Sequence, residues 1–162
     1  SGLAPKSLNN NTSAVLLAIQ LGLEVGLTPM ASLQNIAVIN GRPSIWGDAM
    51  LAVCRASGVF DEEVYEETIT GQGDAMFASC TVGRLPNGNP QTRTFSVADA
   101  KTANLWGQNT WKLYPKRMLQ MRARSWALRD VFADYLRGMR AAEEQMDCID
   151  VESFPEIGRA HV

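Results

Sequence analysis

Histidine and cysteine are scarce in this 162-residue sequence. The one histidine, His161, is next to the last residue, so histidine-based catalytic triads and histidine-rich metal sites are not expected. The cysteines Cys54, Cys80 and Cys148 are odd in number, widely spaced and outside any CxxC pair. A disulfide scaffold or a structural zinc site is therefore not expected, and a reducing cytoplasm is the simplest compartment.

Long apolar runs and phosphate-binding signatures are also missing. No stretch of about 18 apolar residues occurs, so we expect no transmembrane helix. The sequence shows no basic segment followed by an apolar one near its start, so we expect no secretory signal. Neither GxxxxGK[ST] nor GxGxxG occurs, so ATP hydrolysis of the phosphate-loop type is not expected. Hydrophobic residues, at 46%, are nevertheless frequent enough to build a core.

The order of apolar patterns and turn signals predicts an α+β fold, with helices packed on an antiparallel sheet. In chain order we expect a helix over 12–26, a hairpin over 35–47, a helix over 48–57, a three-stranded meander over 59–96, a short helix over 97–105 and a long helix from Pro115 at least through Phe132. No linker divides these elements. We therefore expect one domain over 1–145, followed by an acidic, flexible tail over 146–162.

Local signals predict several details. Asn40-Gly41 suits the positive φ values of a tight hairpin turn, whereas Pro43 favours an edge position for the second hairpin strand. Ser96 and Asp99 are spaced as a capping box for the short helix. The apolar stripe expected on the first helix is Leu16, Leu17, Ile19 and Leu23, and that of the long helix is Met118, Met121, Leu128, Phe132, Tyr135, Leu136 and Met139.

Basic residues gather in one part of the chain. The formal net charge is −2, yet residues 101–140 hold nine Lys or Arg against two Asp, a local net charge of +7. On an ideal helix Arg122, Arg129 and Arg140 lie along one flank of the apolar stripe, and Arg117 and Arg124 lie along the other. Two interpretations stay open: a face for a polyanion, or arginines that are solvated or paired with acids of the same chain.

Other side chains offer less chemistry. Trp126 is expected to pack in the core, whereas Trp111, beside Lys112 and a polar loop, is expected to be more open and able to stack on a base. The carboxylate pairs Glu62/Glu63 and Glu66/Glu67 could bind a metal but are more typical of a solvated edge. Cys54 and Cys80 are expected to be buried and inert, and no nucleophile has a candidate base. The sequence thus does not indicate an enzyme.

Two segments resemble the phage RecT/Bet (Redβ-like) single-strand annealing proteins. The first runs through Leu21-Gly22-Leu23, Asn40-Gly41-Arg42, Ile45-Trp46-Gly47-Asp48 and Arg55-x-Ser57-Gly58, and is similar to the N-terminal half of that family. The second, Arg117-Met118-Leu119-x-x-Arg122-Ala123 followed by Arg129-x-x-Phe132, is similar to the basic helix of the Bet branch. The resemblance covers roughly residues 12–145.

The resemblance implies a protein of the bacterial host cytoplasm that binds single-stranded DNA and anneals it to a complementary strand without ATP. It also implies rings or helical filaments of identical copies, and a phage exonuclease as a further partner. No cofactor is implied; Mg²⁺ is compatible but not required. Arg122 and Arg129 would contact the DNA backbone. The full set of candidate DNA contacts is Arg122, Arg129, Arg117, Arg124, Lys116, Lys112, Trp111 and Lys101.

Two alternatives come from other classes. One is a phage structural or assembly protein whose basic helix docks on an acidic protein partner. The other is a small metal-dependent nuclease that uses the carboxylates of the meander. Binding to an oligonucleotide separates the first from an annealing protein, and shortening of DNA with magnesium identifies the second.

Overall fold

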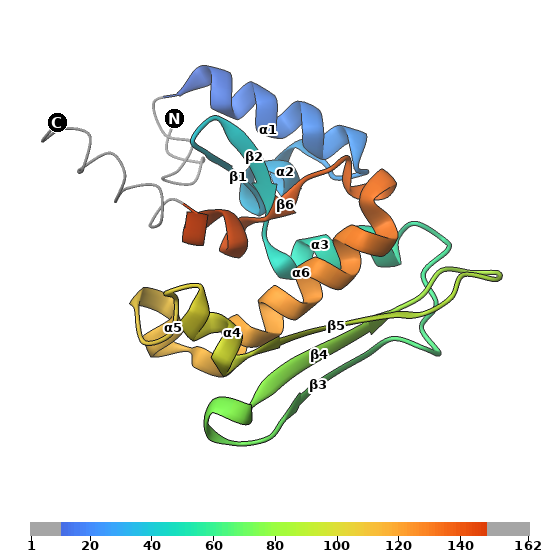
Figure 1. Cartoon of the computed structure of the whole chain (residues 1–162). Coiled ribbons are helices and arrows are strands. Elements are labelled where there is room, and N and C mark those ends of the chain that lie inside the picture. The colour runs from blue at the N-terminus through green and yellow to red at the C-terminus, as the bar shows by residue number, and fades with distance from the viewer. Residues whose placement is uncertain (1–10, 149–162) are drawn as a thin grey trace, which may run out of the picture. The chain divides into compact units, whose positions relative to one another are not determined.

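The computed structural model describes residues 11–148 and has the expected α+β fold (Figure 1). The chain forms two compact units. Among the described residues, one unit contains those up to Trp46 together with those from Met139 to Cys148, and the other spans Gly47–Gly138. Among the described helices, none alone is long and apolar enough to cross a membrane, although α1 (Thr12–Glu24) and α2 (Pro29–Asn35) taken together, bent by 113°, reach that length and composition.

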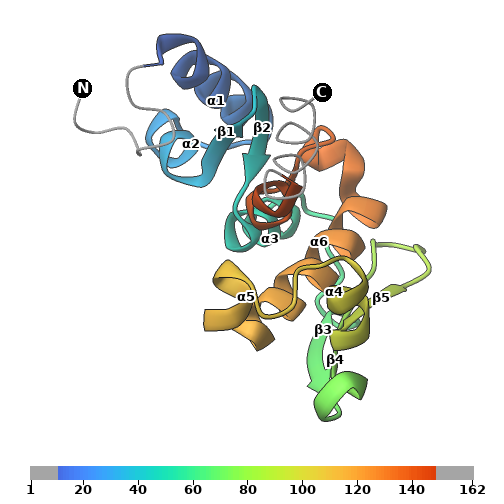
Figure 2. The same ribbon diagram turned by 60° about the vertical axis from the view of Figure 1, so that its left-hand side comes forward.

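The first unit packs two helices on a small sheet (Figure 2). Its elements are α1 (Thr12–Glu24), α2 (Pro29–Asn35), β1 (Ile36–Ile39), β2 (Arg42–Ile45) and β6 (Arg140–Ala141). The hairpin turn is confirmed, since Asn40 and Gly41 have φ values of 51° and 75°. Helix α2 was not expected, although Thr28 as cap and Pro29 in the first turn are ordinary start signals.

The edge position expected for the second hairpin strand is wrong. The strand order is β1-β2-β6, so β2 is central, with β1 antiparallel and β6 parallel to it. Strand β6 pairs only with Ser44 and Ile45, which lie beyond Pro43. The proline, which has no N–H to donate, is therefore tolerated in a central strand.

The apolar stripe expected on α1 is also wrong. Leu16 and Leu23 are 61% and 55% exposed, whereas the buried face consists of Ala14, Ala18 and Gly22. The cause is the close approach of α2: a Cβ at Gly22 would lie 1.7 Å from the Ser32 Oγ. A larger side chain could not occupy position 22 at this approach, and the other buried residues of the helix are alanines.

The second unit is built on the predicted three-stranded antiparallel meander (Figure 1). It contains α3 (Gly47–Arg55), β3 (Glu66–Thr70), the short 3-10 helix η2 (Gly73–Ala75), β4 (Phe77–Val82), β5 (Gln91–Ser96), α4 (Val97–Thr102), α5 (Asn109–Leu113) and α6 (Pro115–Leu136). The Ser96–Asp99 capping box of α4 is confirmed. Helix α5 was not expected, because 107–110 was interpreted as a loop.

Helix α6 lies between α3 on one side and the meander on the other. Ala78, Cys80 and Val82 of β4 and Phe95 of β5 point toward it and are buried. The opposite face of the sheet carries no Lys or Arg. Besides Glu66 and Phe77 it presents hydroxyl groups, of which those of Thr81 and Thr92 are 2.8 Å apart; the other hydroxyl-bearing residues are Thr68, Thr70, Ser79, Thr94 and Ser96.

Most of the apolar stripe expected on the long helix is confirmed, since Met118, Met121, Leu128, Phe132 and Leu136 are all buried. Phe132 departs from helical geometry, with φ −121° and ψ 28°. The helix ends where Arg137 and Gly138 adopt positive φ values. Arg140 therefore lies in β6 and not, as expected, on the helix flank beside Arg122 and Arg129.

Of the flexible tail expected over 146–162, the structure describes only 146–148, which belong to a helix. Residues 142–148 are helical, and Gln145 and Asp147 are buried. The remainder of the predicted tail, 149–162, lies outside the described residues.

Candidate nucleic-acid interface

Three side chains of α6 and one of β5 make up a candidate basic site in the second unit. Arg122, Trp126 and Arg129 are spaced by four and three residues, so they project from the same face of the helix. Arg93 pairs across the sheet with Cys80, whose side chain is buried toward α6, so Arg93 points to the same side. Sequence reasoning missed Arg93, although its alternation with Phe95 was a usable signal.

Arg93, Trp126, Arg129 and Asp130 line a pocket of about 260 Å³. All four side chains are half-buried or exposed, so the pocket opens at the surface. One water molecule needs roughly 15 Å³ by the same measure, which leaves ample room for a phosphate group. Two guanidinium groups face one carboxylate here, so the lining carries a net positive charge.

Within the pocket, Asp130 forms an ion pair with Arg93. The Arg93 Nε donates to the Asp130 Oδ2 at 2.6 Å, and the Arg93 Nη1 donates to the Thr92 carbonyl oxygen at 2.9 Å. Both charged side chains are partly exposed. An anion that enters the pocket must therefore compete with Asp130 for Arg93.

The guanidinium group of Arg122 packs against two aromatic rings. Its guanidinium carbon is 5.2 Å from the centroid of Phe95 and 5.8 Å from that of Trp111, and Trp126 packs edge-on against Phe95 at 5.2 Å. These cation–π contacts restrain the side chain. Trp111 is only 2% exposed, so its expected open position is wrong: its ring packs against that of Phe95, with centroids 5.8 Å apart.

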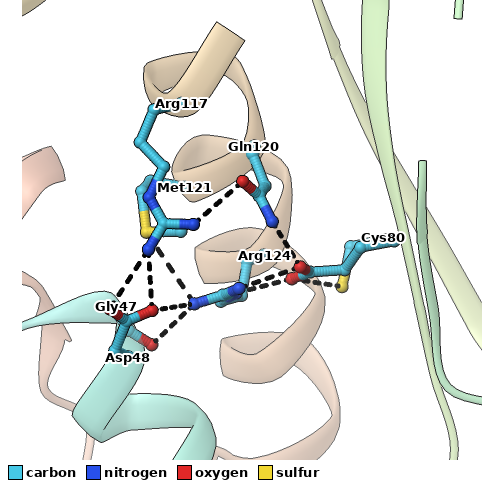
Figure 3. Close-up of polar contacts among 8 residues, drawn as sticks. Gly47, Asp48, Cys80, Arg117, Gln120, Met121 and Arg124 are labelled. Atoms are coloured by element: carbon cyan, nitrogen blue, oxygen red, sulfur yellow. Dashed lines mark hydrogen bonds and ion pairs between the residues drawn. The ribbon is translucent and has the colours of Figure 1, made fainter. Parts of the chain in front are cut away.

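Arg124, one of the candidate DNA contacts, is buried in an ion-pair network inside the second unit (Figure 3). It donates twice to Glu67 of β3, from Nε at 2.5 Å and from Nη2 at 2.8 Å. Its Nη1 donates to the Asp48 Oδ1 at 2.8 Å, and Gln120 completes the network by donating to Glu67 at 2.7 Å. Arg124 thus connects α6 to both β3 and α3.

The network has a clear electrostatic balance. Burial alone would raise the pKa of Glu67, but the hydrogen bonds from Arg124 and Gln120 outweigh it, so the pKa lies below its ordinary value. Burial would likewise lower the pKa of Arg124, but the bonds to Glu67 and Asp48 raise it overall. The pKa of Asp48 is lowered, chiefly by its hydrogen bond from Arg124. All three groups are charged at neutral pH.

Two further candidate contacts carry a carboxylate partner at the surface. The Arg117 Nη2 donates to both oxygens of Asp48, at 2.9 and 3.1 Å, and Lys101 Nζ donates to Asp74 at 2.6 Å. Lys112 on α5 and Lys116 in the first turn of α6 are exposed. The structure therefore brings Arg129 together with Arg93 in one pocket and gives the other candidate cations different surroundings.

The carboxylates of the meander are not gathered in one place. Glu62 accepts from Arg55 at 2.8 Å, whereas Glu67 accepts from Arg124 on the face covered by α6. Within residues 11–148, no three His, Cys, Asp or Glu side chains come together as a metal site would need. Cys54 and Cys80 are buried as expected, and burial raises the pKa of each to about 12.

Two comparisons with known proteins found no match. No protein-family model matches the sequence. No curated protein is significantly similar to it. The resemblance to the RecT/Bet proteins therefore rests on the motifs quoted above.

Proposed function

We propose that this protein binds single-stranded DNA and anneals it to a complementary strand without ATP. The observation that carries the proposal is the pocket in which Arg93 and Arg129 flank the indole of Trp126. Arginine offers a planar fork of donors that fits phosphate oxygens and never loses its charge. The motif resemblance over roughly 12–145, of which Arg129 is a part, is a second support.

The geometry suits annealing because it grips the sugar-phosphate chain. Contacts to phosphate hold a strand without reading its sequence, and the base edges stay free to pair with a second strand. The protein needs no nucleophile and no general base for this task, because no covalent bond forms or breaks. Magnesium is not required by the proposal.

A few phosphate contacts bind weakly on their own. For single strands, the logarithm of the affinity falls with the logarithm of the salt concentration by about 0.7 per contact. Copies aligned along one strand would add their contacts, so the proposal includes rings or helical filaments. It also includes a phage exonuclease as the source of single strands, and the cytoplasm of the host cell as the compartment.

The decisive experiment measures oligonucleotide binding by anisotropy at two salt concentrations, and annealing of two complementary oligonucleotides without nucleotide triphosphate. Arg129→Ala alone, and together with Arg122→Ala, should weaken binding and abolish annealing. The matched control is Arg55→Ala, which removes an exposed guanidinium paired with Glu62 on another part of the unit. Thermal unfolding of each variant shows whether the fold is retained.

A wild-type protein that binds no oligonucleotide at low salt would contradict the proposal. The assembly-protein alternative would then account for the basic flank of α6, with an acidic protein surface in place of phosphates. Shortening of the DNA on a denaturing gel in the presence of magnesium would instead support the nuclease alternative.

A further inference from the structure

The corner between α5 and α6 exposes two large apolar side chains. Leu113 and Tyr114 are 69% and 64% exposed, more than any other large apolar residue that the structure describes. Tyr114 is also the most exposed aromatic residue of that group. An aromatic ring left so open in a folded chain has no packing role, so its surroundings decide what it can bind.

The backbone of this corner is held firmly on both sides of Tyr114. Its N–H donates to the Thr110 carbonyl oxygen at 2.8 Å, and its own carbonyl oxygen accepts from the Met118 N–H at 3.0 Å. Trp111 and Met118 are buried on either side of it, and Pro115 fixes the next φ. The ring is thus presented from a rigid support, which lowers the entropy lost on binding.

The charge around the ring is positive. Lys112 and Lys116, two residues away on each side, are both exposed. In the sequence no Asp or Glu occurs between Asp99 and Asp130. Asp48, which faces the first turns of α6, is engaged by Arg117 and Arg124. An exposed aromatic ring between two cations complements a ligand that alternates flat rings with negative charges.

We infer that Tyr114 is a stacking platform for one unpaired nucleobase of a single strand, with Lys112 and Lys116 contacting the phosphates on either side. This rests on the proposed function and adds a specific site to it, at a place that the buried Trp111 cannot serve. Stacking on an aromatic ring tolerates any base. It does require an unstacked base face, so the site selects single strands over duplexes.

The test compares two oligonucleotides of equal length and charge, an oligodeoxythymidylate and a fully abasic strand, by fluorescence anisotropy. Tyr114→Ala should weaken binding to the first by about tenfold and leave binding to the second unchanged. Tyr114→Trp should retain wild-type affinity for both. The matched control is Leu113→Ala, which removes a side chain at least as exposed from the same corner and should change neither affinity by more than about twofold.

Each outcome decides the inference. Equal weakening on both strands by Tyr114→Ala, or equal weakening by Leu113→Ala, would overturn stacking and point to an apolar docking surface for another macromolecule. If Arg129→Ala weakens binding to both strands while Tyr114→Ala affects neither, the proposed function stands and the Tyr114 site is wrong. If the wild-type protein binds neither strand, the proposed function itself fails.

Discussion

Replacing Arg124 with methionine should destabilise the second unit strongly. Methionine has a similar length but no charge, so the change leaves Glu67 inside the protein without its main partner. The side chains of Arg124 and Glu67 are only 6% and 13% exposed. Loss of one partner of such a buried pair costs about 3–5 kcal/mol, because the remaining charge stays desolvated.

We expect the lower end of that range, about 3 kcal/mol. Glu67 keeps its hydrogen bond from Gln120, which offsets part of the loss. Asp48 is 75% exposed, so water replaces the bond that it accepts from Arg124 at little cost. Against a total stability of about 5–15 kcal/mol, this is a large share.

Urea unfolding followed by tryptophan fluorescence measures the effect. Trp106, Trp111 and Trp126 all belong to the second unit, so the signal reports mainly on it. With an m value of about 2 kcal/mol/M, the midpoint should fall by about 1.5 M. The control is the double variant Arg124→Met with Glu67→Gln, which removes both charges and should recover part of the loss. Two results would refute the reasoning. One is a loss of unfolding free energy of less than about 1 kcal/mol for Arg124→Met. The other is a loss for the double variant equal to the sum of the losses of Arg124→Met and Glu67→Gln measured separately.

Three further predictions concern pH, the pocket and the first unit. Because the folded pKa of Glu67 lies below its ordinary value of 4.5, its contribution to stability is complete above that value and is lost as the pH falls through the folded pKa. Urea midpoints between neutral and acidic pH should therefore decline, and Glu67→Gln should flatten the decline; equal slopes would contradict this. Asp130→Asn releases Arg93 and should tighten binding to a single-stranded oligonucleotide severalfold, with a steeper salt dependence; weaker binding in a titration would argue against a competing carboxylate. Gly22→Ala should lower the stability of the first unit by about 1–3 kcal/mol through overpacking against Ser32, and the companion change Ser32→Gly should restore it in a thermal melt; an unchanged melt for Gly22→Ala would show that the helices can separate.

Elements with strong local signals could be predicted from the sequence. The Asn40-Gly41 turn, the Ser96–Asp99 capping box and the alternating strands of the meander depend on neighbouring residues, and the structure has all three. The face that a helix buries depends on its partner. On α1 the apolar pattern favoured Leu16 and Leu23, but the buried residues are two alanines and Gly22, and Gly22 lies directly against Ser32 of α2.

The candidate site likewise has one part that the sequence predicts and one part that it does not. A helical projection placed Arg124 and Arg129 on opposite flanks of α6, which is correct, but it could not show which flank is covered. That was decided by Glu67 and Asp48, which are 57 and 76 residues away from Arg124 in the sequence. Trp111 was misjudged for a related reason, because its packing partner Phe95 belongs to a different element.

The buried pair of Arg124 and Glu67 also bears on how the three strands align during folding. The far side of the meander is lined mostly by threonine and serine, so hydrophobicity alone penalises a misaligned β3 only weakly. A shift of β3 by a single position would turn Glu67 outward and bring Glu66 or Thr68 inward. Thr68 carries no charge to offer Arg124, and in either case the bond from Gln120 would have to form anew. The pair of Arg124 and Glu67, distant in the chain, therefore favours the observed alignment most strongly over the shift that brings Thr68 inward, which the hydroxyl groups of the far side would tolerate.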